Sequence, residues 1–285
     1  MTSRLADVHM HSTVSDGGYS PSQLMEKCAR ANLKIVSLTD HDSTAGITAA
    51  AKFAKQYEMT FIPGIELSTR IKGTNVDILG YGINIEDDNL QNVLSYHRKM
   101  RHRRMEDMLQ KCQEVGLNIQ LEDVERHVTG ETFSRPHLAK ALIEKGYVKN
   151  VQESFEKYLG QHKPCYVPKP EEFSPKEAIE LIHGAGGVAV VAHPVFYDLD
   201  DEIITWVQSF HLDGIEVYHR DHDEQAIKRF LQLAKRAEVK TGRKLFKTGG
   251  SDFHHESYGR IGEQLGETKL PVDEAEFLLS HLRLN

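Results

Sequence analysis

Short apolar and β-branched runs recur along the chain, and most are separated by stretches with the apolar spacing of amphipathic helices. Runs of this length and composition are typical of buried strands. We expect seven strands, at Leu5–His9, Lys34–Leu38, Thr60–Ile65, Val76–Tyr81, Val188–Ala192, Gly214–Tyr218 and Lys244–Thr248. Their alternation with helices predicts an α/β fold with a largely parallel sheet, open or closed.

Two of the intervening helices carry clear start signals. The segments Ser20-Pro21-Ser22-Gln23 and Ser174-Pro175-Lys176-Glu177 each place a serine cap before a proline, with Gln or Glu three residues after the cap. In this pattern the serine side chain accepts from the backbone N–H of the residue three positions later, and the Gln or Glu side chain of that residue accepts from the backbone N–H of the serine. The proline fits the first helical position. We therefore expect helices to begin at Pro21 and at Pro175.

The stretch from Arg98 to Cys165 breaks the alternation. It has helical apolar spacing in MRHRRMEDMLQKCQEVG and in RPHLAKALIEKGY, and it contains no convincing strand. We interpret it as a helical insertion between two barrel strands, followed by a proline-rich return. The chain is then divided into a first barrel part (1–97), a helical insertion that caps the substrate (98–165) and a second barrel part (166–285).

The charge distribution changes this picture only slightly. The formal net charge of −7 excludes a generally basic nucleic-acid-binding chain, and we expect no duplex DNA partner. Residues 98–165 hold 13 Lys and Arg against 10 Asp and Glu, so a net +3 lies in the insertion and −10 elsewhere. A basic insertion suits an anionic substrate, although an ordinary mixed surface explains the difference equally well. The run Arg98–Arg104 falls on an amphipathic helix, and we interpret it as a solvated face rather than a phosphate patch.

The cysteines and the apolar content indicate the cellular setting. Cys28, Cys112 and Cys165 are odd in number and far apart, which favours reduced thiols and no disulfide framework. No apolar run is long enough to span a membrane, and the first residues lack the layout of a secretion signal. We expect a cytoplasmic protein without a membrane partner, and the sequence leaves the oligomeric state open.

Histidine and carboxylate residues follow, or lie within, nearly every predicted strand. His9 and His11 alternate, so both project to one face about 6–7 Å apart. The strand ends of a β/α barrel converge on one face, and charges buried together there would be costly without cations. We therefore predict a site for several metal ions. The residues concerned are Asp7, His9, His11, Asp16, Asp40, His41, Asp42, Glu66, Asp77, His193, Glu216, Asp252 and His254.

Five of these segments, in order DVHMHS, TDHD, GIE, AHP and GSDFH, resemble the motifs of the PHP (polymerase and histidinol phosphatase) superfamily. SRPHLAK and the YLG at 158–160 resemble the branch that acts on nucleotides, which includes a nucleoside 3′,5′-bisphosphate phosphatase and an exoribonuclease that trims short RNA from its 5′ end. The resemblance implies a distorted seven-stranded (β/α)7 barrel with a helical insertion domain. It also implies two or three divalent metal ions, manganese first, with iron and zinc as alternatives.

The resemblance assigns ligands to three metal positions. His9, His11, Glu66 and Asp252 would bind the first ion, Glu66, His193 and Asp77 the second, and Asp16, His41 and His254 the third. Members of the family often have histidine where this chain has Asp77. Because a carboxylate is harder than imidazole, the second position would favour manganese over zinc, be weakly filled or be ligated differently. The alternative that Asp77 is no ligand stays open.

The implied reaction is attack of a metal-bridging hydroxide on the phosphorus of a phosphate ester. His193 and Asp252 are alternatives for the acid that protonates the leaving group. Arg135 could bind a phosphate through two parallel hydrogen bonds, and His137 is the matching candidate for a second substrate contact. The alternative for both is a helix-cap region with exposed polar groups.

His219 and Arg220 lie just beyond the sixth predicted strand, where they would either shape the substrate pocket or serve the local surface. We expect a phosphoesterase acting on small nucleotides or on the 5′ ends of short RNA. The alternatives are a histidinol-phosphate phosphatase, an amidohydrolase acting on C–N bonds and a non-catalytic metal-binding accessory module. The SRPH segment argues against the first, TDHD and GSDFH against the second, and the nearly complete ligand set against the third.

Overall fold

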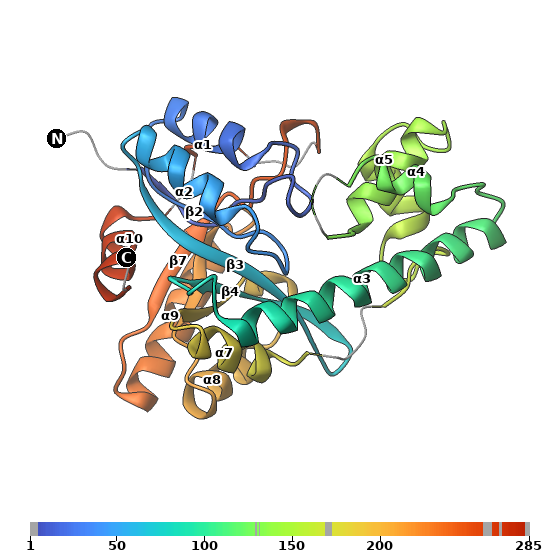
Figure 1. Ribbon diagram of the computed structural model, residues 1–285. Helices are drawn as coiled ribbons and strands as arrows, with labels where there is room; N and C mark the ends of the chain where they lie inside the picture. Colours follow the sequence, from blue (N-terminus) through green and yellow to red (C-terminus); the bar gives the residue numbers. More distant parts are fainter. Residues whose placement is uncertain are drawn as a thin grey trace.

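The computed structural model describes residues 5–128, 130, 132–168, 173–258, 264–267 and 270–282. Its seven strands form one sheet in sequence order, which curls into a nearly closed barrel (Figure 1). The strands are β1 (Leu5–Asp7), β2 (Leu33–Leu38), β3 (Thr60–Ile71), β4 (Thr74–Tyr81), β5 (Val188–Val191), β6 (Gly214–His219) and β7 (Phe246–Gly250). All seven predicted strands and the α/β barrel are thus confirmed.

The barrel closes where the segments after β1 and β7 meet. The Val8 N–H donates to the Gly249 carbonyl (3.3 Å), and the Asp252 N–H donates to the His9 carbonyl (2.8 Å). Gly250 is required at this seam, because a Cβ there would lie 2.5 Å from the Cβ of His9. The seam therefore places the residues that follow β1 directly beside those that follow β7.

The pairing is parallel for β1–β2, β2–β3, β5–β6 and β6–β7, but β4 runs antiparallel to both of its neighbours. Ile71 pairs with Thr74, so β3 and β4 form a hairpin with a two-residue loop. The loop residues Lys72 and Gly73 have φ of 48° and 82°, the left-handed backbone that this tight turn requires. The expectation that seven parallel strand ends meet on one face is therefore wrong for the fourth strand.

The helices cover the barrel and extend it. α1 (Pro21–Arg30), α2 (Ile47–Gln56), α8 (Asp200–Ser209) and α9 (Glu224–Thr241) connect successive strands. The remaining helical segments are α3 (Asp88–Glu114), α4 (Leu121–Glu125), α5 (Arg135–Glu144), α6 (Val151–Ser154), η1 (Phe155–Leu159), α7 (Pro175–Gly184), η2 (Pro194–Phe196), η3 (Glu256–Tyr258) and α10 (Val272–His281). None that is described is both long and apolar enough to cross a membrane.

Both predicted helix starts are confirmed. Ser20 caps α1 and Ser174 caps α7, and in each helix the third residue returns the bond to the cap backbone. The Ser174 N–H donates to Glu177 Oε2 at 2.7 Å. These reciprocal bonds satisfy two backbone N–H groups that would otherwise lack partners at a helix start.

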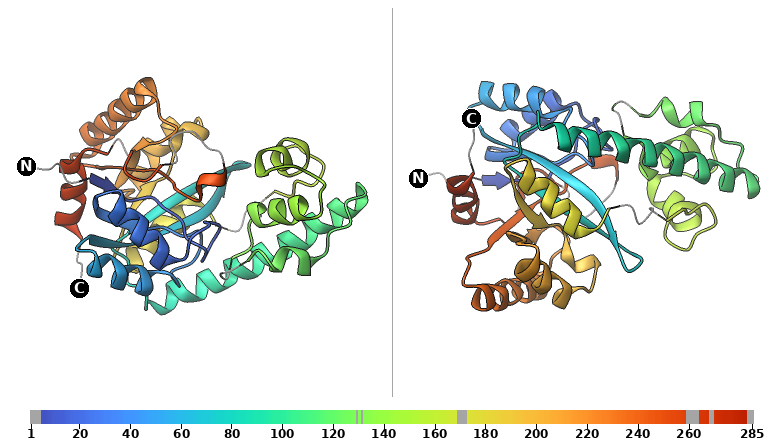
Figure 2. Two further views of the ribbon diagram at one scale, coloured as in Figure 1. Left: turned by 90° about the horizontal axis from the view of Figure 1, so that it is seen from above. Right: turned by 60° about the horizontal axis from the view of Figure 1, so that its bottom comes forward.

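The helix α3 leaves the barrel and carries a separate group of helices at its far end (Figure 1). In both views of Figure 2 this group, α4 to η1, lies to one side of the sheet. It has a hydrophobic cluster of its own, which includes Met105 and Cys112 of α3, Leu138 of α5 and Cys165. The two thiols are buried and reduced.

The opposite end of the barrel is closed by α10. Ala275 and Leu278 pack against Ala6 and Phe246, which lie at the start of β1 and β7. Since strands in the parallel part begin at this end, their carboxyl ends open toward the insertion (Figure 1). The fold therefore leaves one open end of the barrel, and it faces the helical insertion.

Candidate metal centre

Imidazole and carboxylate side chains gather at the open end of the barrel. His9 and His11 follow β1, His41 follows β2, and Glu66 lies within β3. The other members of the gathered set are Asp16, His193, Glu216, His219, Asp252 and His254. Every residue that was assigned to one of the three metal positions, except Asp77, falls in one of the groups that this set forms.

Glu66 lies in the middle of the cluster. Its Oε2 atom is 3.4 Å from His9 Nε2, 3.2 Å from His11 Nε2 and 3.1 Å from His41 Nδ1. Its Oε1 atom is 3.0 Å from His193 Nε2. One buried carboxylate thus approaches four imidazoles, which is the position of a ligand shared between ions.

Several of these atoms are buried without a hydrogen-bonding partner among the described residues, namely Glu66 Oε2, His9 Nε2, His41 Nδ1 and both ring nitrogens of His11. Leaving such atoms unsatisfied is costly. Two ligands about 2.1 Å from one ion lie about 3.0–3.5 Å apart in tetrahedral or octahedral geometry, which is the range of the separations around Glu66. The residues therefore fit divalent metal ions, and mixed imidazole and carboxylate donors suit zinc, iron or manganese.

The ligand atoms form four overlapping groups, within each of which the atoms lie within 4.8 Å of one another. They are His11, Asp16, His41 and His254; His9, His11 and Asp252; His9, Glu66 and His193; and His9, Glu216 and His219. The set predicted for the third ion is brought together, with His11 added. Of the set predicted for the first ion, His9, His11 and Asp252 form one group, and Glu66 lies in another group with His9. That second group also contains His193, so it holds the pair Glu66–His193 predicted for the second ion.

Asp77 occupies a less central position. It pairs with Ser68 of β3, two residues beyond Glu66 on the same face, so it lies near the open end although its strand runs the other way. It is half-buried and belongs to none of the four groups. Burial lowers the pKa of His193. The Glu66 carboxylate and, after it, the negative charge of Asp77 raise that pKa, and together they outweigh burial. Asp77 as a metal ligand stays a prediction.

The electrostatics of the cluster favour added positive charge. Burial alone would raise the pKa of the Glu66 carboxyl, but His41 and the other imidazoles hold it well below its usual value. Burial likewise disfavours the charged form of His11, but Asp252 and Glu66 outweigh it and raise its pKa to about 10. The carboxylates therefore stay ionised at neutral pH, and metal ions would compensate them better than protons can.

Glu216 orients two of the candidate ligands. Its Oε1 atom is 2.9 Å from His9 Nδ1, and its Oε2 atom accepts the His193 N–H at 2.7 Å. A carboxylate on Nδ1 fixes the ring so that Nε2 points at the metal position. We expected Glu216 only as one of the polar residues along its strand. A lone glutamate in the apolar run GIEVY, fully buried here, was the available signal.

A second support comes from Tyr197 and Arg220. The Tyr197 Oη atom is 2.8 Å from His193 Nδ1 and accepts the Asp77 N–H at 2.9 Å. The Arg220 Nη2 atom donates to Asp252 Oδ2 at 3.0 Å, and its Nη1 donates to the Asp252 carbonyl at 2.8 Å. Arg220 thus holds a candidate ligand, and no motif pointed to Tyr197.

His219, predicted to contact substrate, is fully buried beside the cluster, with Nε2 at 3.5 Å from Asp252 Oδ2. Its Nδ1 accepts the Asp221 N–H at 3.2 Å, which leaves Nε2 to face the carboxylate. Its side chain has no exposed area, which argues against the alternative of a local surface role and equally against direct contact with substrate.

Three of the nine described non-glycine residues with positive φ lie at this site. Asp42, His193 and Asp252 have φ of 49°, 25° and 47°, a left-handed region that costs non-glycine residues about 1–3 kcal/mol each. Two of them are candidate ligands, and Asp42 follows His41 directly. Strain retained at such positions is typical of sites where side-chain direction matters more than stability.

The insertion brings basic groups toward this face. The guanidinium carbon of Arg135 lies 5.2 Å from the ring centroid of Phe155 and 5.8 Å from that of Tyr166. Its pKa is lowered by burial, which the charges of Tyr166 and Asp77 oppose. His137 is buried and closes the start of α5, where the Ser134 N–H donates to its Nδ1 at 3.2 Å. His137 therefore takes part in the helix cap, as the alternative from the sequence had it, but its side chain is buried rather than exposed.

The basic run on α3 divides into two faces. Arg101 and Arg104 turn inward: Arg101 Nε donates to Asp42 Oδ2 (2.6 Å) and Arg104 Nε to the Val167 carbonyl (2.8 Å). Interpreting the whole run as a solvated face is therefore wrong for these two residues. Burial, followed by the charges of Arg135 and Arg101, lowers the pKa of Arg104. Three guanidinium groups thus lie close enough to repel one another.

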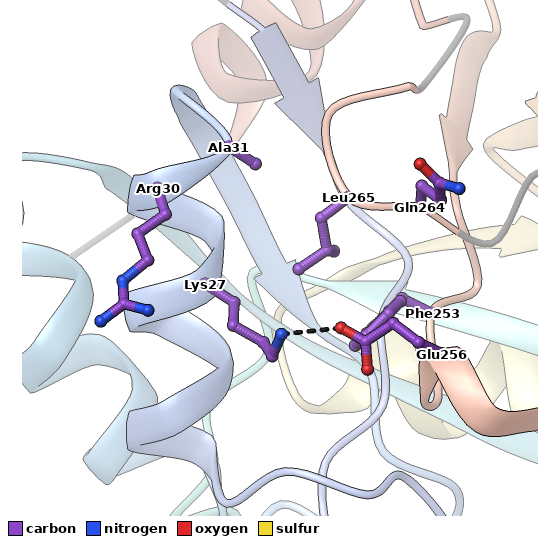
Figure 3. A pocket seen from close by; sticks show the side chains of 7 residues that line it. All are labelled: Lys27, Arg30, Ala31, Phe253, Glu256, Gln264 and Leu265. Carbon is purple, nitrogen blue, oxygen red and sulfur yellow. Dashed lines mark hydrogen bonds and ion pairs between the residues drawn. The ribbon is translucent and has the colours of Figure 1, made fainter.

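A cavity of about 420 Å³ lies apart from this centre, between α1 and the segment after β7 (Figure 3). Lys27, Arg30, Glu256 and Phe253 line it, and the Lys27 Nζ atom is 2.7 Å from Glu256 Oε1. None of the candidate metal ligands contributes to its lining.

Comparison with protein families finds one match, to the PHP domain, over residues 7–160. A 5′-3′ exoribonuclease of Haemophilus influenzae is 30% identical over 87% of this chain and 89% of its own. A 3′,5′-nucleoside bisphosphate phosphatase of Chromobacterium violaceum is 32% identical over 92% of this chain and 91% of its own.

Solved structures share the fold. A Bifidobacterium adolescentis protein, assigned as a metal-dependent phosphoesterase, superposes with a TM-score of 0.87 and 28% identity, over 98% of this chain and 96% of its own. The similarity therefore includes the helical insertion as well as the barrel.

Proposed function

The chain belongs to the PHP domain family and is a metal-dependent hydrolase of phosphate esters, and we propose that its substrates are small nucleotides, namely nucleoside 3′,5′-bisphosphates or the 5′-phosphorylated ends of short RNA. The names of the two bacterial relatives supply these two substrate classes. The chemistry of the open end of the barrel supports them independently.

The observation that carries the proposal is the guanidinium cluster of Arg101, Arg104 and Arg135 beside the metal centre. The three charges repel one another. Burial lowers the pKa of Arg104 most, and the charges of Arg135 and Arg101 lower it further. Divalent ions would hold the reacting phosphate. Because Arg101 is already paired with Asp42 and Arg104 with the Val167 carbonyl, Arg135 is the guanidinium that suits a second anionic group on the same molecule. Nucleoside bisphosphates and RNA ends carry one. Histidinol phosphate has a single phosphate and a cationic amine, which this surface would repel.

Different residues would hold the metal ions and contact the substrate. Ions held around His11, Glu66 and their neighbours would lower the pKa of a water and offset charge on the phosphoryl oxygens. Manganese suits the carboxylate share of the donors best. Arg135 of the insertion 98–165 would contact the substrate, as part of a cap over the barrel parts 1–97 and 166–285. His137, predicted as a second contact, is buried and would instead hold the start of α5 in place.

Of the two candidates for the leaving-group acid, the contacts argue against Asp252. Arg220 donates to Asp252 Oδ2 at 3.0 Å, and Asp252 Oδ1 lies 3.1 Å from His11 Nε2, so the carboxylate is held in its ionised form. An ionised carboxylate has no proton to give.

Two readouts on purified protein test the proposal: release of inorganic phosphate from the bisphosphate and from histidinol phosphate, and release of mononucleotides from the oligonucleotides. Protein stripped with a chelator would be reloaded separately with Mn²⁺, Fe²⁺ or Zn²⁺. The substrates would be adenosine 3′,5′-bisphosphate, 5′-phosphorylated di- to pentanucleotides and histidinol phosphate. We expect the nucleotide substrates to exceed histidinol phosphate by at least about tenfold in kcat/KM, because an unmatched polar group at a buried site is strongly rejected. Absence of release from every nucleotide with every metal would overturn it.

A further inference from the structure

Phe196 lies in an unusual setting for a large apolar side chain. It ends the turn η2 directly after the candidate ligand His193, and 61% of its surface is exposed. The other exposed large hydrophobics among the described residues are Tyr96, Val115 and Val239, which lie on or just after α3 and on α9. Phe196 is the member of this set that borders the metal centre.

Its ring lies against two imidazoles of the site. The ring centroid is 5.6 Å from that of His193 and 6.3 Å from that of His219. These contacts are tilted and edge-on, so they use part of the ring and leave the rest to solvent. An aromatic surface is therefore presented at the rim of the cluster rather than inside it.

The turn holds Phe196 in this position. The neighbouring Tyr197 points inward, with its hydroxyl 2.8 Å from His193 Nδ1. On the other side, the His193 N–H is bonded to Glu216 at 2.7 Å, and His193 has the strained φ of 25°. Since His193 at the start of the turn and Tyr197 directly after it are both anchored, the turn holds Phe196 with most of its ring exposed.

We propose that Phe196 is the stacking platform for the nucleobase of the substrate, an inference that rests on the proposed function. A substrate whose reacting phosphate lies at the metal centre, and whose second phosphate meets Arg135, has its base left to contact the rest of the rim, where Phe196 is exposed. Aromatic side chains bind bases there through their π faces. A phenyl ring offers no hydrogen bonds, so the subsite accepts any of the four bases.

Matched variants separate this role from a general loss of exposed aromatic surface. Phe196→Ala removes the platform and Phe196→Trp preserves it. Tyr96→Ala removes an aromatic ring that is 49% exposed on α3 and contacts His97 instead of the metal centre. Phe196 is exposed enough for its replacement to leave the fold intact.

Two measurements test the platform on the metal-loaded full chain. The first compares kcat/KM for adenosine 3′,5′-bisphosphate with that for the same sugar bisphosphate lacking the base. Because base stacking is lost, we expect Phe196→Ala to reduce kcat/KM roughly 5- to 100-fold for the first substrate and little for the second. The second titrates the 5′-methylenephosphonate of 2-aminopurine riboside, which cannot be hydrolysed and whose fluorescence falls on stacking. We expect quenching with wild type, Phe196→Trp and Tyr96→Ala, and none with Phe196→Ala.

Three outcomes would overturn the inference: equal losses on both substrates, unchanged quenching in Phe196→Ala, or a change of oligomeric state in that variant, which would assign Phe196 to an interface between copies. Failure of the proposed function gives a different result. Wild type would then release phosphate from neither substrate, while the quenching measurement would still decide whether Phe196 binds a base.

Discussion

Asp42 and Arg101 form a buried ion pair, with 2.6 Å between Oδ2 and Nε, that joins the loop carrying His41 to the long helix α3. Ser68 of β3 completes the junction: its N–H donates to Asp42 Oδ1 at 2.9 Å, and its hydroxyl accepts from Arg101 Nη2 at 2.7 Å. The insertion is therefore attached to the barrel at the metal centre itself.

Breaking this pair from one side should destabilise the protein strongly. Arg101→Met leaves a carboxylate buried without its partner, and we expect a loss of about 3–5 kcal/mol in the free energy of unfolding. The double variant Asp42→Asn with Arg101→Met removes both charges and should recover much of the loss. Urea unfolding of metal-free protein measures both. A double variant as unstable as the single one would show that the pair's charge is not the cause.

Metal content should follow the sharing of ligands. His11 belongs to two of the ligand groups and His254 to one. We expect His11→Ala to lower the bound metal, measured by elemental analysis, by more ions per chain than His254→Ala does. Turnover should be abolished in both. Equal metal loss in the two variants would contradict the shared position of His11.

Glu216 should act through the rings that it orients. In Glu216→Gln the charge that fixes His9 Nδ1 is lost while size and shape remain. We expect metal affinity to fall about 10- to 100-fold, the usual effect of losing a carboxylate behind a ligating histidine. Competition with a chelating dye measures this without turnover. An unchanged metal affinity would mean that Glu216 only supports the strand.

Arg135 should affect substrate binding and leave the metals in place. We expect Arg135→Ala to raise KM for adenosine 3′,5′-bisphosphate about tenfold or more, because a charge-assisted phosphate contact is lost. Arg103→Ala is the matched control, since Arg103 lies on the exposed face of α3 and lines a separate depression with Phe133. If both variants behave alike, the insertion acts through its overall charge.

His137 should make stability depend on pH. Burial lowers the pKa of its imidazole from 6.5 to about 4, so the unfolded chain takes up the proton first as pH falls. The stability linked to His137 is fully present above pH 6.5 and is lost as pH falls toward 4, by about 3 kcal/mol. His137→Gln should lack this part of the acid dependence. Unfolding free energies of both proteins between neutral pH and pH 4 measure it, and parallel curves would disprove the assignment.

The sequence by itself determined the strands and most of the candidate ligands. Seven apolar runs with ligand-type residues at their ends are local features, because a strand is set by its own apolar and β-branched residues. The order of the five motifs also indicated the family. His9, His11 and His254 were therefore identifiable before any contact between them was known.

Only the tertiary structure decided which of these groups meet and what supports them. The two-residue turn at Lys72 and Gly73 reverses β4, so Asp77 lies near the open end on a strand that runs the other way. Arg101 lies in a basic run that looks solvent-facing, and it becomes buried because its partner Asp42 arrives from β2. Contacts between residues far apart in the chain depend on the packing of whole elements, which no local pattern encodes.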